Sequence, residues 1–230
     1  MENIKIGQGK GMSNIIAKPS VELMAITPNA EQVIELACRT CYLSFHRYDP
    51  PGSTAELIKK VIRKKHVSVL EHAYATFRIK GGSRTFTHEL VRHRLMSPSQ
   101  ESQRYVEYGK TRNFDVVLPP SVQSSSFKDR YLEMAARCEQ LYSEMIKAEI
   151  PKEDARYILP GGTTSEIVIS ANFREYRHIC EVRCHLRAHW EIRNICLKIL
   201  EILKAEAPIV FDDFIIDWDT QSATLIESDE

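Results

Sequence analysis

The pattern of hydrophobic and polar residues along this chain predicts strands interspersed with helices. Runs rich in aromatic and β-branched residues, with partial alternation, predict strands at residues 21–26, 73–80 and 163–170. Helical periodicity and capping signals predict helices from Thr27-Pro28 to about Tyr42, from the capping box Ser53-x-x-Glu56, and over 83–93, 124–149, 153–157 and 172–207, the last as two helices or one interrupted helix. Because strands and helices do not alternate regularly, the pattern indicates an α+β fold rather than a doubly wound sheet.

Glycine and proline residues mark the expected breaks between these elements. Gly81-Gly82 is expected to end the second strand, and Ser97-Pro98-Ser99 to break a helix before a polar loop that continues through Tyr105. Because no repeat, low-complexity run or linker divides the chain, residues 1–230 are expected to form a single domain. Within it, residues 1–18 are interpreted as a loose arm or short edge strand, and residues 216–230 as a tail.

Charge and hydropathy argue against several classes of protein. Lys and Arg together number 31, as do Asp and Glu, so no global field favours nucleic acid or an anionic membrane. No apolar stretch approaches the roughly 20 residues needed to cross a bilayer, and the N-terminus lacks an apolar signal-peptide core. Six cysteines without a secretion signal are typical of reduced thiols, so a cytoplasmic protein is expected. Any anion binding must therefore come from local basic clusters.

The densest unusual chemistry lies in the segment FTHELVRHRLMSPSQESQRY, from Phe86 to Tyr105. On a helix, His88 and Arg92 would share a face, and the Arg-His-Arg at its end would bring three cationic or donor groups together. Arginine forks bind phosphate oxygens at two points, and Ser and Gln side chains can read the edges of a planar ring. These residues therefore fit a pocket for a phosphorylated, ring-containing ligand, with a solvated basic helix end as the alternative.

A second basic cluster, between Asn172 and His189, contains four arginines and three histidines. Because an isolated buried guanidinium is costly, these cations need anionic partners from the protein or from a ligand. An exposed helix neutralised by Glu175, Glu181 and Glu191 is the competing interpretation.

Metal and hydrolase chemistry fit the sequence less well. The motif Cys38-x-x-Cys41 and the pair Cys180 and Cys184 would form a zinc site only if they met in the fold, and small thiols in a helical pattern usually fill core space. His185 and His189 share a helix face but lack the glutamate of the metalloprotease signature. There is no G-x-S-x-G elbow, and the glycine-rich Gly7–Gly11 is neither a P-loop nor a dinucleotide fingerprint. No metal site is expected.

The spacing Arg92-His93-Arg94, seven residues, Ser102, then x-Arg104-Tyr105 resembles the signature of the flavin-dependent thymidylate synthases. Further similarities at matching intervals are Glu71-His72, Ala155-Arg156 with Leu159-Pro160, Asn172-x-Arg174, Arg183 and His189-Trp190-Glu191-Ile192. The resemblance covers residues 20–215 approximately. It implies a central, mostly antiparallel sheet flanked by helices, a homotetramer whose sites are shared between subunits, and methylation of dUMP to dTMP.

The same resemblance implies roles for individual residues. The implied dUMP contacts are Glu89, Arg92, Gln100, Glu101, Ser102, Gln103, Arg104, Arg156 and Arg183. The implied FAD contacts are Ser68, Arg92, His93, Arg94, Gln100, Asn172, Arg174 and His178. Arg183 is the expected catalytic residue, because a fixed cation beside the uracil imide favours its ionised, more nucleophilic form. Arg104 and the Ser102 hydroxyl would hold the phosphate.

The implied cofactor is FAD, reduced by NADPH, with methylene-tetrahydrofolate as the carbon donor. No enzyme nucleophile is implied: flavin-independent thymidylate synthases use a cysteine in a Pro-Cys-His context, and none of the six cysteines here follows a proline. A related flavoprotein acting on another nucleotide, or lacking folate chemistry, is one alternative. A nucleotide- or RNA-binding module is another, although nucleic acid and membranes are not the expected partners.

Two positions depart from the family pattern. Many relatives have Asn-Glu where this chain has Ser99-Gln100, with Glu101 one place later, so whether Gln100 or Glu101 meets the flavin is left open. Where some relatives carry Gln, this chain has Glu89, whose carboxylate would repel a nucleotide phosphate unless Arg92 neutralised it.

Overall fold

The computed structural model describes residues 16–226, which form two compact units. Unit 1 contains Lys80–Thr87, Gln100–Glu166 and the described residues before Ser20. Unit 2 contains Ser20–Ile79, His88–Ser99 and the described residues from Ile167 onward. Residues 1–15 of the predicted arm and 227–230 of the predicted tail lie outside the described part of the chain.

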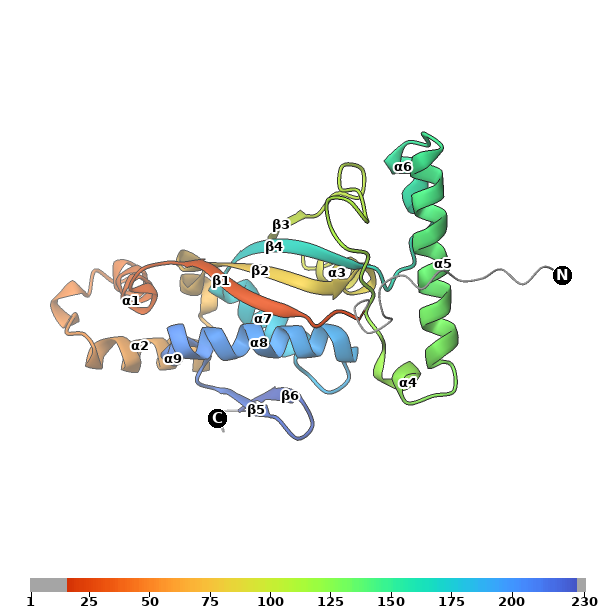
Figure 1. The fold of residues 1–230 in the computed structure, drawn as a ribbon. Coiled ribbons are helices and arrows are strands. Elements are labelled where there is room, and N and C mark those ends of the chain that lie inside the picture. Colours follow the sequence, from red (N-terminus) through yellow and green to blue (C-terminus); the bar gives the residue numbers. More distant parts are fainter. Residues whose placement is uncertain (1–15, 227–230) are drawn as a thin grey trace. The chain divides into compact units, whose positions relative to one another are not determined.

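Figure 1 shows the helices and strands along the chain. The strands are β1 (Ser20–Ile26), β2 (Tyr74–Ser83), β3 (Ser97–Gln100), β4 (Thr164–Asn172), β5 (Phe214–Asp217) and β6 (Ser222–Leu225). The α-helices are α1 (Ala30–Thr40), α2 (Gly52–Arg63), α3 (Arg84–Leu90), α4 (Pro120–Gln123), α5 (Lys128–Lys147), α6 (Lys152–Ala155), α7 (Phe173–Arg183), α8 (Trp190–Glu206) and α9 (Pro208–Phe211). Short 3-10 helices are η2 (Phe45–Arg47), η3 (Val67–His72) and η4 (Arg156–Ile158).

The main sheet has the strand order β1-β2-β4-β3, and most of its residues belong to unit 2. The Thr27 amide donates to the Tyr74 carbonyl at 2.9 Å, which joins the end of β1 to the start of β2. The Phe173 amide likewise donates to the Ala73 carbonyl at 2.9 Å, at the end of β4. Both neighbours of β2 therefore run antiparallel to it. The predicted α+β class with an antiparallel sheet is confirmed.

Helices α7 and α8 lie on one side of β1, β2 and β4 in unit 2 (Figure 1). Tyr176 of α7 is fully buried, packs edge-on against Phe77 with ring centroids 5.4 Å apart, and donates its hydroxyl to the Ala75 carbonyl at 3.2 Å. The spacing of Ile192, Ile195, Ile199 and Ile202 predicts one buried helix face: in α8 the first three are completely buried, whereas Ile202 is half-buried. The interruption between α7 and α8 also agrees with the sequence.

Unit 1 has its own hydrophobic core beside α5. Tyr108, Phe114 and Tyr142 are buried there, and the Tyr108 ring packs edge-on against both other rings. Helix α5 covers Lys128–Lys147 rather than the predicted 124–149, because the preceding residues form turns after the separate helix α4.

Two predicted helix starts are wrong. Helix α1 follows Asn29, which has a left-handed conformation, because the Thr27 hydroxyl accepts instead from the Tyr74 amide at 2.9 Å. Helix α2 has no side-chain cap, and Ser53 does not form the predicted capping box. Its hydroxyl donates to Glu35 at 2.6 Å, so a tertiary partner replaces the local one.

The predicted breaks around the main sheet are also corrected. Strand β2 continues through Gly81, which has a φ of 74° and lies so close to Lys18 that a Cβ would sit 2.8 Å from its carbonyl oxygen. Ser97–Gln100, predicted as a break and loop, forms strand β3. Because β3 is an edge strand, Pro98 does not interrupt the sheet.

Part of the predicted tail is ordered as well. Strands β5 and β6 form an antiparallel hairpin in which Phe214 pairs with Leu225 and Asp217 with Ser222. The Ala223 amide also donates to the Cys184 carbonyl at 2.8 Å. Residues 216–225 thus belong to the folded part of unit 2. No helix among residues 16–226 is both long and apolar enough to span a membrane.

Candidate functional site

The centre of the candidate site in unit 2 is Arg183, the last residue of α7. Its Nε donates to Nε2 of His93 at 2.8 Å, and its guanidinium also forms an ion pair with Glu89. These partners precede it in the sequence by 90 and 94 residues. The fold therefore brings the first basic cluster of the sequence into contact with the second.

His93 lies in the interior, with 8% of its surface exposed. Its Nδ1 is 3.7 Å from a carboxylate oxygen of Glu175, and its ring centroid is 5.7 Å from that of His178. Burial, followed by the positive charge of Arg183 and by His178, lowers the pKa of His93 to about 4. The imidazole is therefore neutral near pH 7, and the contact with Glu175 is not an ion pair there.

Arg92 and Arg94 differ from His93 because both are exposed. Helix α3 ends at Leu90, so the Arg-His-Arg follows the helix and is not part of it. The predicted sharing of a helix face by His88 and Arg92 is wrong for this reason. Neither the Arg92 nor the Arg94 side chain forms an ion pair with the described residues, which leaves both guanidinium groups available to an external anion.

In unit 1, the predicted loop after Ser99 begins with two strongly held side chains. Gln100 donates to the Thr87 hydroxyl at 2.7 Å and to the Ser165 hydroxyl at 3.1 Å. Glu101 forms an ion pair with Arg112 and accepts from the Tyr108 hydroxyl at 3.1 Å. The start of this loop is fixed by internal hydrogen bonds.

The following residues of the loop are held less tightly. The Ser102 hydroxyl accepts from the Arg104 amide at 3.3 Å, and Gln103 donates to the Tyr108 hydroxyl at 3.3 Å. The Arg104 guanidinium lies 5.5 Å from the centre of the exposed Tyr105 ring. Arg156, at the start of η4, donates to the Glu153 carbonyl at 3.0 Å. Neither Arg104 nor Arg156 has a carboxylate partner among the described residues.

The remaining predicted flavin contacts lie around the start of α7 and in η3. Asn172 caps α7 by accepting the Glu175 amide at 2.9 Å. Arg174 forms an ion pair with Glu71 at 2.5 Å, both side chains being about half exposed. Ser68 and His178 are exposed, in η3 and α7 respectively.

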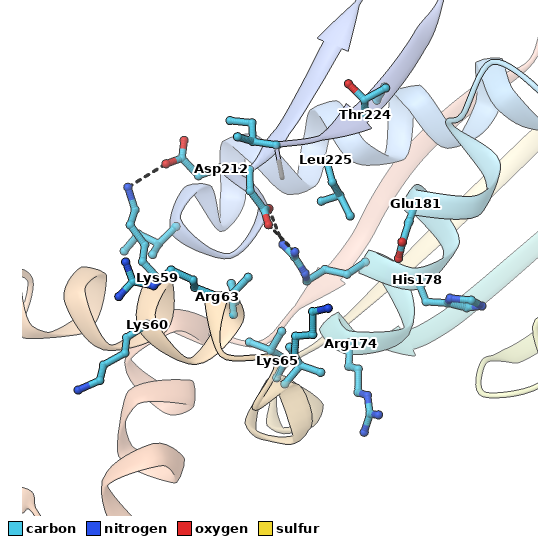
Figure 2. Close-up of a pocket in the computed structure, with 18 of the residues that line it drawn as sticks. Lys59, Lys60, Arg63, Lys65, Arg174, His178, Glu181, Asp212, Thr224 and Leu225 are labelled. Carbon is cyan, nitrogen blue, oxygen red and sulfur yellow. Dashed lines mark hydrogen bonds and ion pairs between the residues drawn. The ribbon is translucent and has the colours of Figure 1, made fainter. Parts of the chain in front are cut away.

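An open hollow in unit 2 is lined by basic, acidic and apolar residues (Figure 2). Its cations are Lys59, Lys60, Arg63, Lys65, Arg174 and Arg177, and its carboxylates are Glu56, Glu181, Asp212 and Asp213. Lys59 pairs with Asp212 at 2.9 Å and Arg177 with Asp213 at 2.6 Å. The hollow has more cations than carboxylates, and in Figure 2 Arg174 and His178 extend from α7 beside it.

Comparisons with known proteins agree with this geometry. Residues 22–209 match the family model described as thymidylate synthase complementing protein. Flavin-dependent thymidylate synthases of Geobacter sulfurreducens and Mycobacterium marinum are 38% and 35% identical to this chain, over 84% and 88% of it and 85% and 86% of their own lengths. The chain belongs to the flavin-dependent thymidylate synthase family. The predicted family and enzyme class are confirmed.

A solved member of the family has a similar fold. Thymidylate synthase X from Helicobacter pylori, in a crystal structure with FAD and dUMP, is 27% identical to this chain. The match covers 85% of this chain and 98% of that one, with a TM-score of 0.72. The chain therefore shares its overall fold with a family member that was crystallised with FAD and dUMP.

The two departures from the family pattern have structural partners. Arg92 was the expected partner that would neutralise Glu89, but Glu89 pairs with Arg183 instead. The Glu101 carboxylate is bonded to the Arg112 side chain, the Tyr108 hydroxyl and the Glu166 amide. Among the described residues, the Gln100 side chain is bonded only to hydroxyl groups. A neutral amide bonded to two hydroxyls exchanges partners at lower cost than a carboxylate in an ion pair.

Four of the six cysteines are buried, which argues against thiol chemistry at those positions. Cys38, Cys180, Cys184 and Cys196 are buried and Cys41 is exposed, and all are free thiols. Burial, together with the neighbouring Cys41 and Glu35, raises the pKa of Cys38 to about 11. Among residues 16–226, no three His, Cys, Asp or Glu side chains are arranged to hold a metal ion.

Two residues that hold the predicted contacts, Glu175 and Arg112, were not predicted from the sequence. Glu175 was considered only as a surface counter-charge, yet it is 5% exposed and faces His93. Its place three residues after a capping Asn and three before His178 was the available signal. Arg112, which holds Glu101 and donates to the Thr164 hydroxyl at 2.6 Å, lies in a turn-rich segment and gave no such signal.

Proposed function

We propose that this enzyme methylates dUMP to dTMP, with methylene-tetrahydrofolate as the carbon donor and FAD, reduced by NADPH, as the hydride source. The observation that supports this most strongly is the contact of Arg183 with both Glu89 and His93. It joins a residue of the R-H-R motif to the arginine that family resemblance assigns to the uracil ring. The similarity to a relative crystallised with FAD and dUMP supports the same choice of ligands.

In this proposal, Arg183 polarises the uracil ring. Its guanidinium is partly exposed, at 18% of the side chain, so one edge can face a ligand while Nε stays bonded to His93. A cation held in place stabilises negative charge on the ring imide without further reorganisation. The further dUMP contacts proposed are Glu89, Arg92, Gln100, Glu101, Ser102, Gln103, Arg104 and Arg156.

The residues proposed for FAD suit an anionic, ring-containing cofactor. They are Ser68, Arg92, His93, Arg94, Gln100, Asn172, Arg174 and His178. Arg92 and Arg94 are exposed and lack carboxylate partners, and Arg174 lies beside a hollow with an excess of cations, so a diphosphate group fits this set of donors. When bound and reduced, FAD supplies a hydride, and the residues of the chain bind and orient the two ligands.

We further propose that residues 1–230 act as one domain, that four chains assemble with shared sites, and that the enzyme works in the cytoplasm. These proposals rest on the family resemblance. Sedimentation analysis of the purified protein tests the tetramer: a mass near four times 26.5 kDa is expected, and a stable monomer with full activity contradicts it.

The function is tested by loading the purified protein with FAD and incubating it with dUMP, labelled methylene-tetrahydrofolate and NADPH. Labelled dTMP is expected only when all components are present, together with visible flavin absorption of the protein. A colourless protein that cannot be loaded with FAD contradicts the proposal. Binding of RNA that weakens steeply with salt, without any flavin, would support the nucleic-acid-binding alternative.

We predict that no cysteine acts as a nucleophile. The variants Cys38→Ala, Cys41→Ala and Cys184→Ala should each keep dTMP formation within about threefold of the parent, because the buried Cys38 and Cys184 mainly fill space and the exposed Cys41 donates to the Ala37 carbonyl of its own helix. Turnover is measured at saturating substrates, with circular dichroism to verify folding. Abolished methyl transfer in any folded variant would restore the thiol-nucleophile hypothesis.

A further inference from the structure

A buried carboxylate, that of Glu175, lies next to His93, which in turn contacts Arg183 of the candidate site. It lies in the first turn of α7, where its amide is bonded to the capping side chain of Asn172. Its side chain is 6% exposed and directs a carboxylate oxygen to Nδ1 of His93, 3.7 Å away. Glu175, His93, Arg183 and Glu89 therefore follow one another in a row within unit 2.

The proton on His93 is fixed by this row of contacts. Arginine has donors and no acceptor, so the His93 nitrogen that faces Arg183 must be the unprotonated one. That nitrogen is Nε2, which places the proton of the neutral ring on Nδ1, facing the carboxylate of Glu175. At 3.7 Å from Nδ1 the carboxylate is beyond hydrogen-bond distance, so it favours this tautomer through its negative charge and not through a direct hydrogen bond.

We propose that Glu175 is a positioning residue for the dUMP reaction: through His93, it keeps an acceptor in front of Arg183 and so fixes the guanidinium. The role assigned to Arg183 rests on the proposed function. Without that acceptor, the guanidinium keeps Glu89 as its carboxylate partner and is drawn toward it. Glu175 touches neither ligand in this proposal and acts only on the placement of Arg183.

The variant Glu175→Gln tests this most sharply, because the side chain keeps its shape but loses its charge, and its amide can either accept from Nδ1 or donate to it. Where the amide donates, the proton of His93 lies on Nε2 and opposes the Nε–H of Arg183. We expect kcat/KM for dUMP to fall about tenfold, with FAD binding retained. Solid-state 15N NMR of histidine-labelled protein should show a share of His93 with its proton on Nε2 that the parent protein lacks, with the signal assigned from a His93→Gln sample.

A second variant distinguishes a positioning role of the Glu175 side chain from a role in packing alone. In Glu175→Ala, a water molecule can accept from Nδ1, so the tautomer is kept and the loss of kcat/KM should be smaller than in Glu175→Gln. If Glu175 only fills space, the alanine variant should be the more damaged of the two. Glu201→Gln, an exposed carboxylate on α8, serves as the control and should behave like the parent.

The outcomes distinguish this inference from the proposed function. A proton on Nε2 of His93 in the parent protein overturns the inference, as does full dUMP activity in a Glu175→Gln variant whose tautomer has changed. Failure of the parent protein to make dTMP with FAD bound contradicts the proposed function instead. The NMR result remains interpretable in that case because it requires no turnover.

Discussion

Replacing Arg183 with alanine is expected to lower kcat/KM for dUMP by about 10²–10³-fold, the usual effect of removing one preorganised group that stabilises developing charge. The protein should still bind FAD, because the other proposed flavin contacts remain. Steady-state kinetics with varied dUMP give the first quantity, and visible absorption after gel filtration gives the second. Near-normal turnover in a folded, flavin-loaded variant would refute the role assigned to Arg183.

Two further variants make this result specific. Arg183→Lys retains a positive charge but loses the fork that contacts Glu89 and His93 together, so it should recover only a small part of the activity. Arg137→Ala removes an exposed arginine of α5 that pairs with Glu133 and should leave turnover unchanged, because exposed pairs contribute little. Equal losses in Arg183→Ala and Arg137→Ala would indicate a nonspecific effect of removing positive charge.

The largest expected effect on stability comes from Glu35→Ala. The Glu35 carboxylate is completely buried and accepts from Arg39, from Ser53 at 2.6 Å and from Thr54 at 2.5 Å. Removing it leaves a nearly buried guanidinium and two hydroxyls without their acceptor. We expect the free energy of unfolding to fall by about 3–5 kcal/mol, measured by urea denaturation at fixed protein concentration.

A control variant and a pH dependence accompany the predicted loss of stability in Glu35→Ala. Glu201→Ala on the exposed face of α8 should change the free energy of unfolding by less than about 0.5 kcal/mol. Burial tends to raise the pKa of Glu35, but hydrogen bonds from Ser53, Thr54 and Arg39 outweigh it and the pKa is lowered. Its contribution is therefore present above the ordinary glutamate pKa and lost as the pH falls through the lowered value.

A compensating double variant tests the mechanism of that loss. Glu35→Leu combined with Arg39→Met removes both charges and keeps most of the volume, so it should be more stable than Glu35→Ala. If Glu35→Ala alone costs less than about 1 kcal/mol, the network is not the source of stability assigned to it.

The fold was predictable where a pattern depends on neighbours along the chain. The stripe at Ile192, Ile195, Ile199 and Ile202 correctly predicted a helix with one buried face, because helical spacing alone places these side chains on one face, although Ile202 is only half-buried. Ser53 was misread because its hydroxyl had a local partner in the sequence and a tertiary one, Glu35, in the fold. Ser97–Gln100 was misread because proline is compatible with a strand only at the edge of a sheet, which no local pattern shows.

The candidate site was likewise predictable only in part from the sequence. The spacing of Arg92, His93, Arg94 and Ser102 was enough to place the chain in its family, because a loop that binds fixed groups constrains residue types at fixed intervals. It did not show that Arg183, rather than Arg92, is the partner of Glu89, nor that His93 is buried while its two arginine neighbours are exposed. Those pairings join residues about 90 positions apart, and they depend on how α7 packs behind the motif. The order Glu175, His93, Arg183 and Glu89 therefore emerges only from the tertiary structure, since contact and burial decide which cation meets which carboxylate.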